Sequence, residues 1–460
     1  MEDTKRQKTS IKEALSKEVK VKPEGPMMGA DSTLLDLKSE KPMFNRHLME
    51  AVCERNNLKQ ALKRVKQNKG APGIDRMTVD SLGEHLKRNW LDIKAQLLSG
   101  TYKPKPVRQV AIPKPKGKGS RILGIPCVLD RFIQQALLQT IQPSWDPKFS
   151  EHSYGFRPGR SAHQAIAQAQ KYLKMGYEYV VDIDLEKFFD RVPHNRLMSK
   201  LTKEIEDKRA LKLIRSYLNA GAMSGGLTSP TTKGVSQGSP LSPFLSNVVL
   251  DELDKELEAR GHKHARYADD CNIYVKSKRA GERVKRSITR FIEKRLKLRV
   301  NEDKSAVDLP RRRKFLGFTF TGGKDPNRRQ IAPESIARFK VKIRQLTRRN
   351  RSINMEERIN ELSKYMKGWR GYFGYCETSS IFKELDGWIR RRLRCIHWKQ
   401  WKTFKKRRKE LIKLGIKEKD AVWAAMSSRG PWMLSHIPQV RRALSIKYFK
   451  EAGLPTLAPV

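Results

Sequence analysis

The sequence has few acidic residues for its length and lacks the long apolar runs of a membrane protein. Among 460 residues, Lys and Arg number 97 and Asp and Glu only 49, which gives a net charge of +48. No apolar run approaches the roughly 20 residues of a spanning helix, and the polar N-terminus does not resemble a secretory signal. We therefore expect a polyanionic partner bound in a salt-dependent way, and no membrane partner.

Cysteine is also scarce, and its spacing excludes two further classes of protein. The five cysteines are scattered and contain no Cys-x-x-Cys pair, which argues against a zinc ribbon and against a disulfide framework. This usage is typical of a reduced, cytosolic protein. The expected location is the cytoplasm, in association with the nucleoid. The cysteines are Cys53, Cys127, Cys271, Cys376 and Cys395.

The length predicts two or more domains. Residues 1–43 are charged and contain three prolines, so we expect a poorly ordered extension. From Phe44 to Trp90 the pattern is helical, with lysines that face outward. Near the C-terminus, apolar residues from Met355 to Phe373 recur at steps of three and four, and a second such pattern runs from Ile381 to Ile396. The last third therefore predicts a helical bundle with a basic surface.

Two acidic stretches carry the candidate chemistry. Asp269 and Asp270 follow an apolar lead-in and precede an apolar run, which predicts a hairpin with both acids at its turn. Asp182 and Asp184 alternate with apolar residues in a second predicted strand. Adjacent acids repel and are best tolerated beside a divalent cation. The alternative is an ordinary surface turn. If the strands converge, they suit two metal ions ~4 Å apart, which clamp the oxygens of a phosphoryl transfer.

These stretches resemble a known family. The Tyr-Ala-Asp-Asp sequence at 267–270, preceded by an Asp-x-x-x-x-Phe strand, resembles the palm of reverse transcriptases. The loop at 153–161 and the Gly-Trp-x-Gly-Tyr-Phe sequence at 368–373 resemble the group II intron-encoded reverse transcriptase/maturase. The motifs occur in order from about residue 44 onward. The resemblance is to the short bacterial form without an endonuclease domain. Ser236 and Ser239 depart from the common Pro-Gln-Gly-Gly-Pro pattern.

The resemblance implies a fold and an activity. The fold is an α+β right-hand polymerase, with a fingers-palm core and an α-helical thumb that is also the maturase domain. The implied divisions are an N-terminal fingers extension at 44–105, fingers-palm at 106–321, thumb/maturase at 322–415 and a basic DNA-binding region at 416–460. The implied activity is RNA-directed DNA synthesis, together with assistance to splicing. The implied partners are intron RNA, a DNA target and primer strand, and deoxynucleoside triphosphates.

The resemblance also implies a set of site residues. Two Mg²⁺ ions would be held at Asp184, Leu185, Asp269 and Asp270, with the three Asp residues catalytic. Asp184 is preferred to Asp182 because the family has an aromatic five residues after its metal-binding Asp, and Phe189 meets that spacing. Phe189 would then exclude the 2′-hydroxyl of ribonucleotides. The implied substrate-binding residues are Lys114, Arg121, Phe189, Gln237, Gly238 and Lys304; the implied nucleic-acid contacts are Arg157, Arg160, Arg390, Arg391 and Arg394.

Other interpretations remain open at this point. Lys114 and Arg121 also fit a solvated basic hairpin, Lys304 an exposed loop lysine, and Phe188 and Phe189 two core aromatics. The basic bundle also fits an ordinary polymerase thumb. Two rival functions are a splicing factor with an inactive polymerase, and a domesticated reverse transcriptase in defence or repair.

Overall fold

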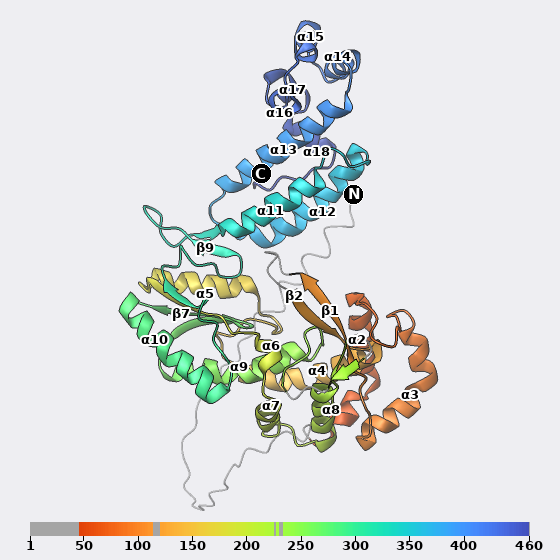
Figure 1. Ribbon diagram of the computed structural model, residues 1–460, viewed down its shortest axis with the longest axis vertical. Coiled ribbons are helices and arrows are strands. Elements are labelled where there is room, and N and C mark those ends of the chain that lie inside the picture. Colours follow the sequence, from red (N-terminus) through yellow and green to blue (C-terminus); the bar gives the residue numbers. More distant parts are fainter. Residues whose placement is uncertain (1–45, 114–119, 225–226, 230–232, 460) are drawn as a thin grey trace, which may run out of the picture. The chain divides into compact units, whose positions relative to one another are not determined.

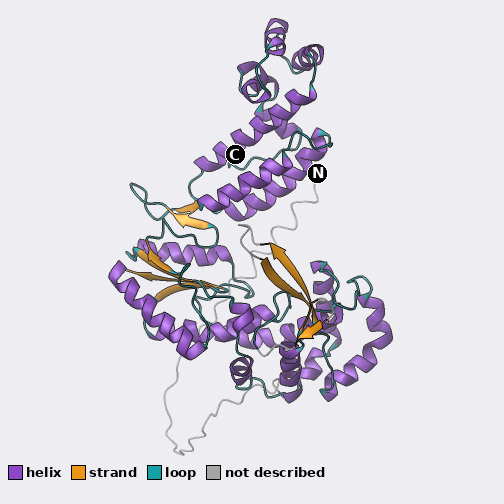
Figure 2. Ribbon diagram, in the orientation of Figure 1, coloured by secondary structure: helices purple, strands orange, loops and turns teal. Residues whose placement is uncertain are grey.

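The computed structural model describes residues 46–113, 120–224, 227–229 and 233–459, which belong to one compact unit (Figure 1). The predicted extension at 1–43 and Lys114 lie outside these residues. Helices and strands are both present, with helices predominating (Figure 2). In the described ranges, no helix is long and apolar enough to cross a membrane. All five cysteines are free thiols.

The segment at 46–105 is a set of three helices packed on a fourth. They are α1 (Leu48–Val52), α2 (Arg55–Asn68) and α3 (Leu82–Ser99), and α1 and α2 contact α4 (Val128–Trp145). The buried face of α2 is built from Ala61 and Val65. The helical pattern predicted for this segment is thus present, interrupted by the turn cluster around residue 70.

A first four-stranded sheet has the order β2-β1-β4-β5. Its hairpin of β1 (Val107–Pro113) and β2 (Ser120–Ile125) is antiparallel, with Pro113 opposite Ser120. The basic hairpin expected from the sequence is therefore present. The short strands β4 (Ala222–Ser224) and β5 (Leu227–Ser229) extend it.

A second four-stranded sheet has the order β6-β7-β3-β8. All its neighbours are antiparallel. Its strands are β3 (Tyr179–Ile183), β6 (Lys263–Tyr267), β7 (Asp270–Val275) and β8 (Ala306–Asp308).

Alternate residues of this sheet pack into two different cores. Val181 and Ile273 belong to the core that includes α9 (Ser242–Ala259) and α10 (Lys278–Phe291). Val180 and Tyr274 instead pack with α5 (Ala162–Lys174). In Figure 1 the strands accordingly lie between α5 and α10. Because the sheet is covered on both faces, its open end is where polar chemistry is possible.

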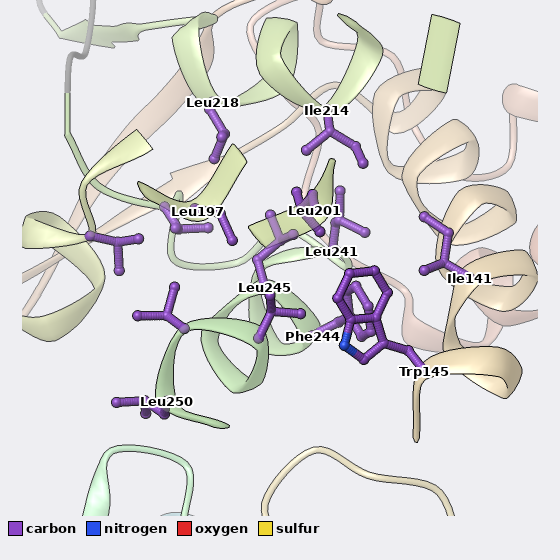
Figure 3. Close-up of a cluster of buried hydrophobic side chains, with 14 of the residues drawn as sticks. Ile141, Trp145, Leu197, Leu201, Ile214, Leu218, Leu241, Phe244, Leu245 and Leu250 are labelled. Atoms are coloured by element: carbon purple, nitrogen blue, oxygen red, sulfur yellow. The ribbon is translucent and has the colours of Figure 1, made fainter. Parts of the chain in front are cut away.

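The largest core joins α4 to α7 (His194–Leu201), α8 (Lys208–Asn219) and α9 (Figure 3). Trp145 meets Phe244 edge to face at 5.5 Å between ring centroids. This packing holds the start of α9, which begins at Ser242.

The C-terminal helices share one core. The two helices predicted from apolar spacing are α12 (Met355–Phe373) and α13 (Ser380–Gln400). Residues beyond 416 do not form a core of their own, because Ala421, Leu444 and Leu457 pack in the same cluster as Leu362 and Leu393. The remaining members are α11 (Pro333–Leu346), α14 (Phe404–Lys413), α15 (Glu418–Met426), α16 (Pro431–Leu434), α17 (Pro438–Ala443) and α18 (Ile446–Glu451).

Short elements connect these parts. They are the 3₁₀ helix η2 (Asp146–Lys148), α6 (Phe188–Arg191), the π-helical turn η3 (Ile292–Leu296) after α10, and the two-stranded pair β9 (Phe318–Phe320) and β10 (Arg329–Ile331).

Candidate functional site

The three residues predicted to be catalytic, Asp184, Asp269 and Asp270, lie at the same end of the β6-β7-β3-β8 sheet. In the antiparallel register Ile183 faces Cys271, so the next residue along β3, Asp184, comes opposite Asp270. Asp269 lies in the β6–β7 turn, where Tyr267 pairs with Asp270. The hairpin with two acids at its turn is thus confirmed.

The electrostatics at this end favour a bound cation. Burial raises the pKa of the Asp270 carboxyl to about 7, and the charges of Asp269, Asp182 and Asp184 add to the effect. Protein atoms surround the Asp270 carboxyl closely enough to weaken its hydration, but the residue keeps exposed surface, so a cation has access to it. The Nζ of Lys304 lies 3.1 Å from Oδ2 of Asp184. The Lys304 ammonium group is therefore a positive charge that lies beside these acids.

The donor set fits a hard divalent ion, because Mg²⁺ prefers carboxylate oxygens. In the part of the chain that the structure describes, however, no three Asp, Glu, His or Cys side chains converge closely enough to hold a metal. The buried side chain of Leu185 is a hydrocarbon and has no donor atom, so only the backbone oxygen of this residue is a candidate ligand. An ion at this end would be held by the carboxylates of Asp184, Asp269 and Asp270, with water or phosphate oxygens as further ligands.

The strand end at Asp184 is held by the segment at 299–305. The amide of Asp184 donates to Ser305 Oγ at 2.9 Å, and the amide of Asn301 donates to the Asp184 carbonyl at 2.8 Å. Asp182 is engaged in an ion pair of 2.6 Å with Arg313. Arg313 also donates to the Lys304 carbonyl. Asp182 therefore supports the loop that carries Lys304, a link that the sequence did not reveal because Arg313 lies far along the chain.

The turn that contains Gln237 and Gly238 is tied to β2. The amide of Gly124 donates to the Gln237 carbonyl at 2.9 Å, and Ser236 Oγ donates to the Gly124 carbonyl at 3.1 Å. Gly238 has φ +115°, a conformation that L side chains rarely adopt. Ser236, which departs from the common family sequence, therefore links this turn to the β1–β2 hairpin by a hydrogen bond.

Phe189 lies next to the same turn. The amide of Val235 donates to the Phe189 carbonyl at 2.6 Å. The Phe189 ring is half-buried and meets Phe188 edge to face at 5.3 Å, whereas Phe188 is fully in the core. Only Phe189 therefore presents a ring surface toward solvent.

Comparison with known proteins gives two matches along the chain. The model for reverse transcriptase (RNA-dependent DNA polymerase) matches residues 112–320, and that for the group II intron maturase-specific domain matches residues 336–415. Protein YkfC of Escherichia coli (strain K12) is 33% identical over 302 residues, covering 57% of this chain and 79% of that protein. The chain belongs to the group II intron reverse transcriptases. The group II intron-encoded protein LtrA of Lactococcus lactis subsp. cremoris is 36% identical over 197 residues.

The coverage of LtrA is partial, since the match spans 42% of this chain and 32% of LtrA. Among solved structures, a partial Cas6-RT-Cas1–Cas2 complex has 25% identity and a TM-score of 0.35, covering 54% of this chain and 42% of that chain. The family confirms the predicted polymerase fold with a helical maturase region. It also confirms RNA-directed DNA polymerase as the enzyme class, with nucleic-acid partners and divalent metal chemistry.

Arg157 of this reverse transcriptase is enclosed by protein groups, and its predicted contact with nucleic acid stays a prediction. Its side chain is 3% exposed and pairs with Asp146 at 3.0 Å. It also donates to the carbonyls of Ser150 and Ser153, at 2.6 and 2.9 Å. A guanidinium enclosed by protein acceptors in this way stabilises the loop. Arg160 is paired with Glu151 but is more exposed, so its predicted contact stays a prediction.

Arg394 is likewise bonded within the protein, and its predicted contact with nucleic acid stays a prediction. The residue is 8% exposed, and its Nε donates to the Leu444 carbonyl at 2.9 Å. Burial lowers its pKa to about 10. It therefore links α13 to the end of α17.

Arg390 and Arg391 are partly accessible. Burial lowers the pKa of Arg390. Arg391 lies over the Trp432 ring, with its central carbon 3.9 Å from the ring centroid, and donates to the Trp432 carbonyl. Their nucleic-acid contacts remain predictions. Arg121 lies in β2, opposite Ile112.

Proposed function

We propose that this reverse transcriptase adds deoxynucleotides to a DNA 3′ end on an RNA template, at the centre formed by Asp184, Asp269 and Asp270. The observation that carries the proposal is the β3–β7 register, which brings the first acid opposite the acidic turn. Two bound Mg²⁺ ions would clamp the attacking and leaving oxygens of the phosphoryl transfer.

The other residues of the site handle the nucleotide. Phe189 excludes a 2′-hydroxyl by its ring, and the Gln237–Gly238 turn seats the base against the β2 hairpin. Arg121 and Lys114 neutralise the triphosphate. Lys304 is 66% exposed and reaches Asp184, so it is placed to release the carboxylate and hold the departing pyrophosphate.

The maturase match supports a second role. In this proposal the chain binds the RNA of its host intron, assists splicing, and copies that RNA into a DNA target during insertion. Residues 416–460 would contact the DNA. The setting would be the cytoplasm, beside the nucleoid. Intron boundaries in the DNA that flanks the coding region would distinguish this role from a domesticated one in defence or repair.

The test of the proposal is Asp269→Ala in primer extension on an RNA template with Mg²⁺. Extension is expected to fall below detection while RNA binding is retained, because the positive charge that holds RNA lies elsewhere. Asp325→Ala is the control, since Asp325 is 78% exposed in the β9–β10 loop and pairs with nearby Arg328. Extension by Asp269→Ala at the parent rate would refute the assignment of the acids. Retained splicing by the same variant would show that the two roles are separable.

A further inference from the structure

Arg266 lies in the strand that leads into the acidic turn, and it is completely buried. Its Nε donates to Asp254 Oδ1 at 2.7 Å and its Nη2 donates to Asp254 Oδ2 at 2.5 Å. This is a two-pronged guanidinium–carboxylate pair between β6 and α9, of the kind that fixes geometry as well as charge.

The same guanidinium holds three further acceptors. Its Nη1 donates to Asn247 Oδ1 at 3.0 Å and to the Ala268 carbonyl at 2.9 Å. Its Nη2 donates to Ser153 Oγ at 2.6 Å. One side chain thus joins helix α9, the loop around Ser153 and the turn that carries Asp269 and Asp270.

Arg266 hydrogen-bonds to Ala268 in the turn, and Ala268 has an unfavourable backbone conformation. Ala268 has φ +57°, in the left-handed region that alanine rarely occupies. Its carbonyl is the oxygen that Arg266 binds, and the next residue is Asp269. An anchor at this peptide therefore acts directly on the backbone that orients the acidic pair.

The loop around Ser153 closes on the same turn. The amide of Arg266 donates to the His152 carbonyl, and the amide of Tyr154 donates to the Arg266 carbonyl, both at 2.9 Å. A Cβ on Gly155 would lie 2.3 Å from the Ala268 nitrogen. Asn247 Nδ2 donates to the Gly155 carbonyl at 2.8 Å. The loop around Ser153 and Gly155 therefore packs against the acidic turn, and both Arg266 and Asn247 hydrogen-bond to this loop.

We propose that Arg266 is a positioning residue for catalysis: it sets the backbone of the acidic turn, and through it the carboxylates of Asp269 and Asp270. The proposal rests on the proposed function, because it takes these acids as metal ligands. Groups that orient metal ligands commonly affect metal affinity by about 10-fold or more when removed. The effect on metal binding separates this role from simple stabilisation.

The chain offers a matched control in Arg358, which is 1% exposed in the C-terminal helices. Its guanidinium donates to the carbonyls of Leu346 and Arg348, both at 2.9 Å, and it holds no acidic turn. Arg358→Met therefore removes a buried guanidinium without touching the site.

The experiment compares Arg266→Lys with Arg358→Met in the full-length protein. Mn²⁺ binding without nucleic acid is followed by electron paramagnetic resonance of the free ion, and the Mg²⁺ midpoint, kcat and KM of primer extension are measured alongside. Lysine keeps the charge beside Asp254 but cannot span the other acceptors. We expect weaker Mn²⁺ binding, by about 10-fold, with a reduced kcat and an unchanged KM for the nucleotide. Arg358→Met is expected to lower thermal stability alone.

A second variant covers the case in which Arg266→Lys does not fold. Asn247→Ala keeps the Arg266–Asp254 pair but removes the bonds to Arg266 and Gly155, so a smaller shift in the same direction is expected. Parent-like Mn²⁺ binding in the folded Arg266 variant, or in Asn247→Ala if that variant alone folds, would overturn the proposal. Asp269→Ala runs in parallel: if it binds Mn²⁺ and extends primers like the parent, the assignment of the acids fails instead.

Discussion

Burial decides what a single arginine does in this chain of net charge +48. Removing a guanidinium from water is costly, so a buried one needs acceptors that replace its hydration. The acceptors of Arg157 are Asp146 and two carbonyl oxygens. Arg394 donates to the Leu444 carbonyl. Arg266 donates to Asp254 and to the acidic turn. These buried arginines stabilise the folded protein, and exposed side chains are the ones available to contact polyanions.

The role of Arg157 can be tested by Arg157→Met. Breaking a buried ion pair from one side leaves Asp146 without its partner, so we expect a loss of about 3–5 kcal/mol in the free energy of unfolding. Urea titration of the free energy measures this loss, and RNA binding at several salt concentrations should show an unchanged slope. Arg160→Met is the comparison, because exposed pairs are worth about 0–1 kcal/mol. A shallower salt slope for Arg157→Met would instead support the predicted phosphate contact of Arg157.

Phe189 supports a prediction about sugar selection. Phe189→Ala should admit ribonucleotides into the product, since the ring next to the Gln237 turn no longer obstructs the 2′-hydroxyl. Product analysis after extension with mixed nucleotides measures the change. Phe188→Ala is the control: its ring is 3% exposed in the core, so the expected result is a loss of about 3–5 kcal/mol in stability with selectivity retained. Unchanged selectivity in the Phe189 variant would place the gate elsewhere.

The residues of the site were predictable to different degrees. The acidic strand and the acidic turn were predictable because strand alternation and turn sequences are visible over a few neighbouring positions, whereas the choice of Asp184 over Asp182 came from the family resemblance. Arg157 and Arg266 were not, because their roles depend on partners brought close by folding. The one local signal for Arg266 is an arginine between apolar residues in a predicted strand, which indicates a buried ion pair without naming Asp254.

At the scale of elements, α5 connects the catalytic sheet with the C-terminal helices. Its inner face packs under Val180 and Tyr274. Its first turn carries His163, whose ring stacks on Tyr375 at 4.6 Å. Also, His163 Nε2 lies 2.8 Å from the Tyr372 carbonyl. The start of this helix therefore affects both the polymerase and the maturase parts.

Ser161 begins α5 with a complete capping box, in which Ser161 Oγ accepts from the Gln164 amide and Gln164 Oε1 accepts from the Ser161 amide. Ser161→Ala should cost ~1 kcal/mol in the free energy of unfolding. Ser379 precedes α13 and makes no side-chain capping bond, so Ser379→Ala should be nearly neutral. Denaturant titration of both variants measures the difference. Equal effects would mean that the Ser161 cap contributes nothing.

Long helices were predictable and short elements were not. The apolar steps at 355–373 match α12 because a buried face repeats along its whole length. Helix α10 begins at Lys278, because Ser277 caps it ahead of its apolar face. The three-residue strands β4, β5 and β8 carry too few residues for a pattern, and tertiary pairing alone defines them.

At the scale of the whole molecule, the excess charge must be carried mostly by exposed side chains. Helix α13 was predicted to supply it, but Arg394 is buried and Arg391 is stacked on Trp432. The neighbouring segment offers exposed lysines at 402, 405 and 409 in its place. The RNA contact predicted for α13 is therefore better tested with the exposed lysines at the start of α14.

Replacing Lys402, Lys405 and Lys409 with Gln should make RNA binding less dependent on salt. Each phosphate contact contributes about 0.7 to 0.9 to the slope of log affinity against log salt, so the slope should fall by roughly 2 to 3 if all three contact the RNA. Filter binding of intron RNA over a salt series measures it. Arg279, Arg283 and Arg286 on α10, which are also exposed, provide a control triple that removes the same charge. An equal fall for both triples would mean that net charge alone attracts the RNA. A fall confined to the α14 triple, with extension on a short generic template retained, would locate intron binding on the C-terminal helices.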